Sequence, residues 1–130
     1  MIRRFDCKVV RIALAAGIVF PVLSAGRVAA ANLVTPPLLA PTSQQRLVCI
    51  ASNVDKKPGA ITVTIVAGDG TTAAITTCDT VAPAGTCAAA ASGALTGHCA
   101  IDAKKKTRGA LWLQDAAHDG IPITSVPATK

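Results

Sequence analysis

Aromatic residues are scarce in this sequence, and glutamate is absent. The chain has two phenylalanines, one tryptophan and no tyrosine. Proteins that bind sugars or single-stranded nucleic acid usually stack the ligand on exposed aromatic rings. Trp112 is the one such ring beyond residue 31. Glycoside hydrolysis by paired carboxylates would have to use aspartate alone. These absences argue against sugar-binding, single-strand-binding and glycosidase functions.

No apolar run is long enough to cross a membrane. The longest, Ile12–Leu23, is interrupted by Pro21, and a spanning helix needs about 20 apolar residues. Basic residues precede this run, and the small residues Ala29-Ala30-Ala31 follow it. A charged start, a short apolar centre and an Ala-x-Ala end are typical of a secretory signal. We therefore predict that residues 1–31 form a helical, cleavable signal peptide, cut after Ala31 or alternatively after Ala30. The product would be secreted or periplasmic, with no stable membrane span after cleavage.

Much of the positive charge belongs to the predicted signal peptide. The whole chain has a formal charge of +6, and five of its 13 basic residues are Arg3, Arg4, Lys8, Arg11 and Arg27. From residue 32 onward the net charge is only +2. A strongly basic chain would point to nucleic acid, but the remaining charge is too small for that interpretation. We expect no nucleic-acid partner.

Four cysteines remain after the signal peptide: Cys49, Cys78, Cys87 and Cys99. An even number in a short exported chain indicates two disulfides. Three pairings are possible. We favour Cys78–Cys87, because the loop between them contains Pro83 and Gly85 and can turn back, which leaves Cys49–Cys99 as the second bridge. Bridges of this kind would support a core that alanine fills only weakly.

The same cysteines do not resemble metal ligands. Zinc sites usually contain Cys-x-x-Cys pairs or clustered histidines. Here the cysteines are widely spaced, and the only histidines are His98 and His118. We expect neither a metal site nor a cofactor.

Short strands separated by turn signals fill the chain from Gln45 onward. The clearest is Ala60–Ala67, where Ile61, Val63 and Ile65 alternate with threonines, as in a half-buried strand. Gly68-Asp69-Gly70 is a hairpin signal. Pro122 places the last strand at an edge. The seven expected strands are Arg46–Ser52, Ala60–Ala67, Thr71–Cys78, Thr86–Ser92, Gly97–Ala103, Arg108–Asp115 and Ile121–Val126.

Seven short strands without a helix favour one antiparallel two-sheet sandwich. We place this all-β domain at residues 45–127. Residues 32–44, which contain three prolines, are expected to form an extended arm outside it. Because proline removes backbone donors, we do not expect the arm to pair as a strand with a partner sheet. No internal repeat or second domain is visible.

A family resemblance adds to this interpretation. It is based on Val48-Cys49, Asn53-Val54, the Ile61–Val66 alternation, Gly68-Asp69-Gly70, Cys78, Ala82–Cys87 and His98–Ile101. This order resembles small secreted bacterial β-sandwich domains of uncharacterised function, and the Pro-x-Gly entry to a strand is similar to immunoglobulin-like modules of bacterial surface proteins. The resemblance implies an immunoglobulin-like sandwich and brings no catalytic residues. It also implies that Trp112 packs in the core against a disulfide.

The one concentrated group of charges is the turn Lys104-Lys105-Lys106-Thr107-Arg108. Such a turn could bind an anionic surface, or it could serve only to keep the protein soluble and its sheet edges unpaired. Lys56-Lys57 is a smaller instance. We expect the group Lys104, Lys105, Lys106 and Arg108 to be the candidate anion-binding turn.

No pattern of catalytic residues is evident. None of the serines is in a nucleophile-elbow pattern, and no phosphate-binding loop or dinucleotide fingerprint occurs. We therefore expect an exported, non-catalytic binding or envelope-associated module, whose partner is an anionic envelope surface or another exported protein. The alternative is a small secreted hydrolase or inhibitor, with the loop Asp79–Thr86 as the inhibitory segment.

Overall fold

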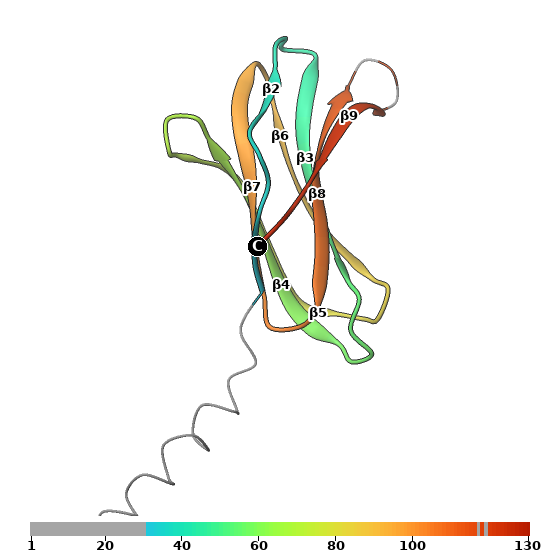
Figure 1. Ribbon diagram of the computed structural model, residues 1–130. Coiled ribbons are helices and arrows are strands. Elements are labelled where there is room, and N and C mark those ends of the chain that lie inside the picture. The colour runs from blue at the N-terminus through green and yellow to red at the C-terminus, as the bar shows by residue number, and fades with distance from the viewer. Residues whose placement is uncertain (1–30, 117, 119) are drawn as a thin grey trace, which may run out of the picture.

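Two antiparallel sheets pack face to face in the computed structural model, which describes residues 31–116, 118 and 120–130 (Figure 1). The all-β sandwich expected from the sequence is therefore confirmed, and the predicted signal peptide, apart from Ala31, lies outside the described residues. The described strands are β1 (Ala31–Val34), β2 (Leu38–Ala40), β3 (Gln45–Asn53), β4 (Gly59–Ala67), β5 (Thr72–Val81), β6 (Thr86–Ser92), β7 (Leu95–Ala103), β8 (Thr107–Asp115) and β9 (Ile121–Pro127).

The strand order decides which connections lie at which end. The five-stranded sheet has the order β1-β7-β4-β5, with β2 also on β7, and the four-stranded sheet has the order β6-β3-β8-β9. Strands β3, β4, β7 and β8 are therefore inner strands. The chain crosses between the sheets from β3 to β4 and again from β7 to β8. Because β3 pairs with β8 and β4 pairs with β7, these two crossings lie at the same end.

The period-two pattern of the sequence forms the core. Ile61, Val63 and Ile65 of β4 are at most 1% exposed and point between the sheets, opposite Leu47 of β3 and Leu111 of β8. The threonines between the isoleucines point outward, as expected. Burial of these aliphatic side chains contributes about 1.5–3 kcal/mol each. Five of the remaining core positions are alanines, which bury little apolar area per residue: Ala40, Ala51, Ala89, Ala91 and Ala103.

Both disulfides have the expected pairing. Cys49–Cys99 joins the inner strands β3 and β7 through the core, with 5.8 Å between the Cα atoms. Cys78–Cys87 joins β5 to β6 where the chain turns from one sheet to the other, with a Cα separation of 6.1 Å. The bridge at Cys49 and Cys99 is fully buried. The cysteines thus connect the two sheets once at the centre and once at a corner.

The segment expected to be a free arm is part of the sandwich. Residues 31–34 and 38–40 pair antiparallel with β7 as β1 and β2, which adds two strands to the seven expected. Pro36 and Pro37 occupy only the gap between them. In that gap Thr35 is 3% exposed and pairs with Cys99, because its N–H donates to the Cys99 carbonyl and its Oγ1 accepts from the Cys99 N–H. The hydroxyl thus replaces a backbone acceptor, and the domain begins before residue 45.

The C-terminal segment closes the same side of the sandwich. β9 is an edge strand, as Pro122 predicted. After it, Ala128 donates to the Gly109 carbonyl, and Thr129 exchanges two backbone hydrogen bonds with Val34 of β1. The chain end therefore passes from the four-stranded sheet to the five-stranded sheet.

Candidate functional site

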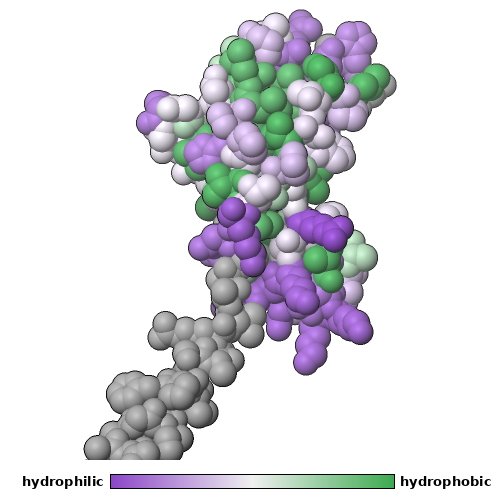
Figure 2. All heavy atoms as spheres, viewed as in Figure 1, coloured by the Kyte–Doolittle hydropathy of each residue, from purple (hydrophilic) through white to green (hydrophobic). Residues whose placement is uncertain are grey.

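Two basic turns meet at one end of the sandwich. The β3–β4 turn (residues 54–58) and the β7–β8 turn (residues 104–106) are joined by a hydrogen bond from the Val54 N–H to the Lys106 carbonyl, at 3.0 Å. Their strands β3 and β8 pair up to Asn53 and Thr107. We call the six cations gathered here the basic end: Lys56, Lys57, Lys104, Lys105, Lys106 and Arg108. Figure 2 shows strongly hydrophilic residues gathered at the lower end of the molecule.

Asn53 fixes the shape of the β3–β4 turn. Its side chain is fully buried, and its Nδ2 donates to the carbonyls of Val81, at 2.8 Å, and Lys57, at 2.9 Å. Its Oδ1 accepts from the Asp55 N–H. Its backbone also bonds with Ala84 and Gly85 of the β5–β6 loop. One amide therefore connects two loops and positions the lysines that follow it.

Asp55 is the carboxylate within these two turns. Its Oδ1 accepts from the Lys57 N–H at 3.2 Å. The backbone N–H of Lys57 lowers the pKa of Asp55 below 3.8, and the backbone N–H groups of Lys56 and Lys106 and the charge of Lys105 lower it further. The carboxylate therefore stays ionised at neutral pH. With the exposed Asp79 of β5 and Asp102 of β7 also near this end, six cations stand against three anions.

The lysine side chains have different surroundings. The stem of Lys105 lies over Gly59, and a side chain at position 59 would overlap it. Lys56, Lys57 and Lys106, together with Val54 and Asp55, line an open hollow of about 350 Å³. Lys104 and Lys106 are exposed. The arrangement leaves most of the ammonium groups directed at solvent, where they can reach an anionic surface.

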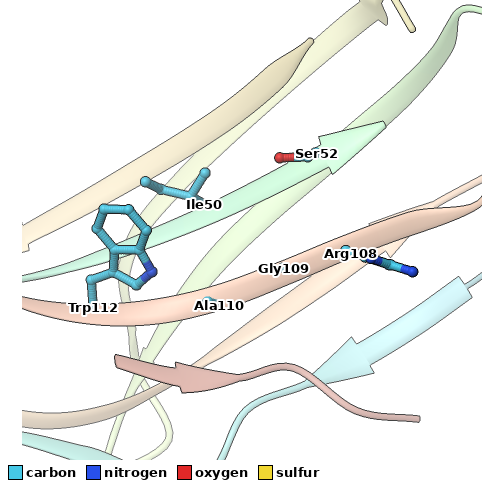
Figure 3. Close-up of a pocket in the computed structure, with 6 residues that line it drawn as sticks. All are labelled: Ile50, Ser52, Arg108, Gly109, Ala110 and Trp112. Carbon is cyan, nitrogen blue, oxygen red and sulfur yellow. The ribbon is translucent and has the colours of Figure 1, made fainter. Parts of the chain in front are cut away.

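A second hollow lies on the outer face of the four-stranded sheet (Figure 3). It is shallow, with a volume of about 240 Å³. In Figure 3 the Trp112 ring stands beside Ile50 at one end, and Arg108 and Ser52 lie at the other. We call this hollow the Trp112 groove and define it by its lining residues: Ile50, Ser52, Arg108, Gly109, Ala110 and Trp112.

Trp112 does not have the position that the family resemblance implied. It pairs across strands with Val48 of β3, next to Ile50 on the outer face, whereas Leu111 pairs with Cys49 and faces the core. The half-buried indole is therefore separated from the Cys49–Cys99 bridge by the sheet itself. Because side chains alternate along a strand, Trp112 faces the opposite side of β8 from its neighbours Leu111 and Leu113. Assigning the ring to the core was wrong, because the leucines already fill the inward positions.

The structure does not bring the histidines together. His98 lies on β7, paired with Val66 on the outer face of the five-stranded sheet. His118 follows β8 at the end opposite the lysines, and its Nδ1 is 2.6 Å from Asp115 Oδ2 in an exposed pair. Within residues 31–116, 118 and 120–130, no three potential ligand residues of the His, Cys, Asp and Glu types form a group suited to a metal ion.

The described residues also contain no helix long and apolar enough to cross a membrane.

Comparison with known proteins supports the fold alone. No protein-family model matches the chain, and no curated protein matches it. The crystal structure of Thermotoga maritima 1070 is similar, with a TM-score of 0.53 over 79% of this chain and 96% of that one. Its sequence identity is 8%, so the similarity is one of backbone arrangement and transfers no site residues.

Proposed function

We propose that this protein is an exported, non-catalytic binding module that attaches to anionic envelope surfaces through its basic end. The observation that supports the proposal most strongly is the junction of two turns, more than forty positions apart in the chain, at the Val54–Lys106 hydrogen bond. The fold thereby brings the positive charges of two turns, each modest by itself, to one surface. Clustered cations produce a local field that attracts anionic groups, and each Lys or Arg near an anionic bilayer contributes about 1 kcal/mol.

The position of the lysines argues against a role limited to edge protection. Proteins often place lysines on edge strands to prevent sheets from pairing with each other. Here both turns connect inner strands, β3 with β4 and β7 with β8. The edge strand β5, in contrast, has no charged residue from Thr72 to Cys78. The cations are therefore concentrated where edge protection does not require them.

The extracytoplasmic location is part of the proposal. Two disulfides are typical of oxidising compartments such as the periplasm or the exterior, and both bridges are present. An envelope location also provides anionic lipids and polymers as targets. Export itself rests on the predicted signal peptide at residues 1–31, and the proposal includes both a secreted and a periplasmic protein.

An immunoglobulin-like relationship is likewise proposed only for part of the fold. Cys49–Cys99 joins inner strands of the two sheets, as the B–F disulfide does in antibody domains. After β7, however, the chain crosses to the four-stranded sheet as β8, whereas strand G of those domains lies beside F. The likeness is therefore restricted to the region from β3 to β7.

The alternative functions have less support. A hydrolase would need a histidine near a nucleophile in a cleft, and His98 and His118 lie in different parts of the fold. An inhibitor would present the disulfide-closed segment. That loop is short, because β5 extends to Val81, and its Ala84 and Gly85 backbone groups are bonded to Asn53. The loop therefore has little backbone left to offer a protease.

Sedimentation with lipid vesicles tests the proposal. The exported, processed protein, verified by intact mass, is mixed with phosphatidylglycerol vesicles at low and high salt. The variant with Lys104, Lys105 and Lys106 changed to glutamine keeps the Lys105 stem over Gly59 but loses three charges. The matched control changes Thr42, Ser43 and Gln44 to glutamate in the exposed β2–β3 turn, which lowers the net charge equally at the opposite end.

We expect the original protein and the glutamate control to be retained at low salt and released at high salt, because salt screens exposed charges. The glutamine variant should stay in the supernatant. Equal retention of the glutamine variant and the original protein would overturn the proposal. If both variants lose vesicle retention equally, net charge alone explains the binding, and the proposal is likewise overturned.

A further inference from the structure

The outer face of the four-stranded sheet has an apolar centre. Two rows of side chains run across this sheet in register. One row is Trp112, Val48 and Ala90, and the next is Ala110, Ile50 and Ala88. Val48 is only 8% exposed although it points away from the core. Its neighbours, including the indole, therefore cover it from the solvent side. The Trp112 groove is the open part of this apolar strip.

Cations lie at both ends of the strip. Arg46 is paired with Gln114, and its Nε donates to Gln114 Oε1 at 3.1 Å. At the other end Arg108 is paired in register with Ser52, and no hydrogen bond or ion pair involves its guanidinium within the described residues. The outward positions of β3, β6 and β8 include no acidic residue. The face is therefore apolar along its length and positive at its ends.

This charge pattern selects among possible occupants. A second copy of the chain packed on this face would bring arginines together without a carboxylate to neutralise them, which is unfavourable. An anionic partner avoids that cost. Arginine binds carboxylates with two parallel hydrogen bonds, and the Ser52 hydroxyl beside Arg108 adds a further donor. An occupant with one carboxylate and an apolar body matches both halves of the groove.

We propose that the Trp112 groove binds a medium-chain fatty acid anion, with its carboxylate at Arg108 and its alkyl chain along Ala110 and Ile50 to the Trp112 ring. This site goes beyond the proposed function, since it shares only Arg108 with the basic end. From Arg108 to Trp112 the strand rises about 13 Å, on the order of the length of a ten-carbon chain. The groove is open, so one side of the alkyl chain stays exposed to solvent or to a bilayer.

Tryptophan fluorescence tests this site directly. Trp112 is the one tryptophan in a chain without tyrosine, so its emission reports on the groove. The processed protein is titrated with dodecanoate below its micelle concentration, with acetate and the neutral detergent dodecyl maltoside in parallel. We expect a saturable blue shift with dodecanoate, because the chain displaces water from the ring, and none with acetate.

Variants separate the parts of the site. Arg108→Gln should weaken dodecanoate binding by about tenfold, the effect of losing a charge-assisted hydrogen bond, and should leave any dodecyl maltoside binding unchanged. Ala110→Glu should abolish the shift by placing a carboxylate in the apolar strip. Arg46→Gln is the matched control. It removes a cation from the same face, and the affinity should stay within about twofold because Arg46 lies at the far end.

Three results would overturn the fatty acid site. They are the absence of a saturable shift, an affinity unaffected by Arg108→Gln, or a shift caused by protein concentration alone, which would indicate a second copy on this face. The outcome is independent of the vesicle test, because that test changes Lys104, Lys105 and Lys106 and leaves the groove intact. If the original protein is not retained on vesicles but still binds dodecanoate, the proposed function fails and the fatty acid site stands.

Discussion

Asn53 donates its buried Nδ2 to the carbonyl of Val81 at 2.8 Å, across 28 positions of the chain. The same amide holds Lys57 and Asp55 of the β3–β4 turn. The conformation of one of the two turns of the basic end therefore depends on one uncharged, buried side chain. The amide thus holds a turn of the binding surface in place without using any of its lysine ammonium groups for internal contacts.

Asn53→Ala should destabilise the protein by about 2–4 kcal/mol, because it leaves the Val81 carbonyl without its partner in a buried setting and removes the part-buried hydrogen bonds to the Lys57 carbonyl and the Asp55 N–H. Urea unfolding under oxidising conditions measures this. The control is Asn32→Ala, at an exposed position of β1, where the change should be within about 0.5 kcal/mol. A difference below that size for Asn53→Ala would show that the amide network is not a structural requirement.

The two disulfides should differ in their contribution to stability. Cys49–Cys99 closes 50 positions and Cys78–Cys87 closes nine. In the chain-entropy model their removal costs about 4 and about 2.5 kcal/mol. We expect the Cys49→Ala, Cys99→Ala double variant to unfold at lower urea than the Cys78→Ala, Cys87→Ala double variant. The reverse order would mean that the corner between β5 and β6 limits stability more than the link through the core.

Asp55 makes the β3–β4 turn sensitive to acid. Its pKa is lowered in the folded state, chiefly by the Lys57 N–H, so its contribution to stability is present above the unfolded pKa and is lost as the pH falls through the lower folded pKa. Comparing urea midpoints of the original protein and Asp55→Asn from pH 7 down to pH 2 should show a difference that vanishes only in the acid range. Carboxyl NMR titration should place the Asp55 midpoint below 3.8. A midpoint above that value contradicts the assignment.

Asp69 is an internal comparison for that titration. It lies in the β4–β5 turn, and its Oδ1 accepts from the hydroxyl and the N–H of Thr71, which lower its pKa. Thr71→Ala should therefore move the Asp69 midpoint upward and leave that of Asp55 unchanged.

Local patterns in the sequence predicted most of the sandwich. Alternation from Ile61 to Ile65 and the proline-glycine loop between Cys78 and Cys87 are read over a few residues, and both are confirmed. The strands β1 and β2 were missed because Pro36 and Pro37 argue locally against pairing. Both strands pair with β7, and the Thr35 hydroxyl in the gap between them is bonded to Cys99, 64 positions away, so no local pattern reveals the pairing.

The candidate site was harder to predict from the sequence for the same reason. The turn at Lys104–Lys106 was evident, but its union with Lys56 and Lys57 depends on the pairing of β3 with β8 and of β4 with β7. The Trp112 groove likewise needs the register that places Ile50 and Ala110 side by side. Long-range pairing is decided by the whole sheet, so residue types alone left these surfaces undetermined.

The edge strand β5 should be the part of the molecule most inclined to associate. Ile75 is 62% exposed on it, the stretch from Thr72 to Cys78 has no charge, and no described strand pairs with its outer edge. The edge strand β9 carries Pro122, and the edge strand β6, although also uncharged, exposes only small side chains. Unprotected edges of this composition tend to pair between molecules.

Ile75→Lys should therefore lengthen the lag of thioflavin T aggregation while changing the unfolding free energy by about 0.5 kcal/mol or less. Thr64→Lys, which adds the same charge beside Ile75 on the inner strand β4, is the matched control and should lengthen the lag less. Equal lags for the two variants would show that net charge, and not the exposed edge, governs association.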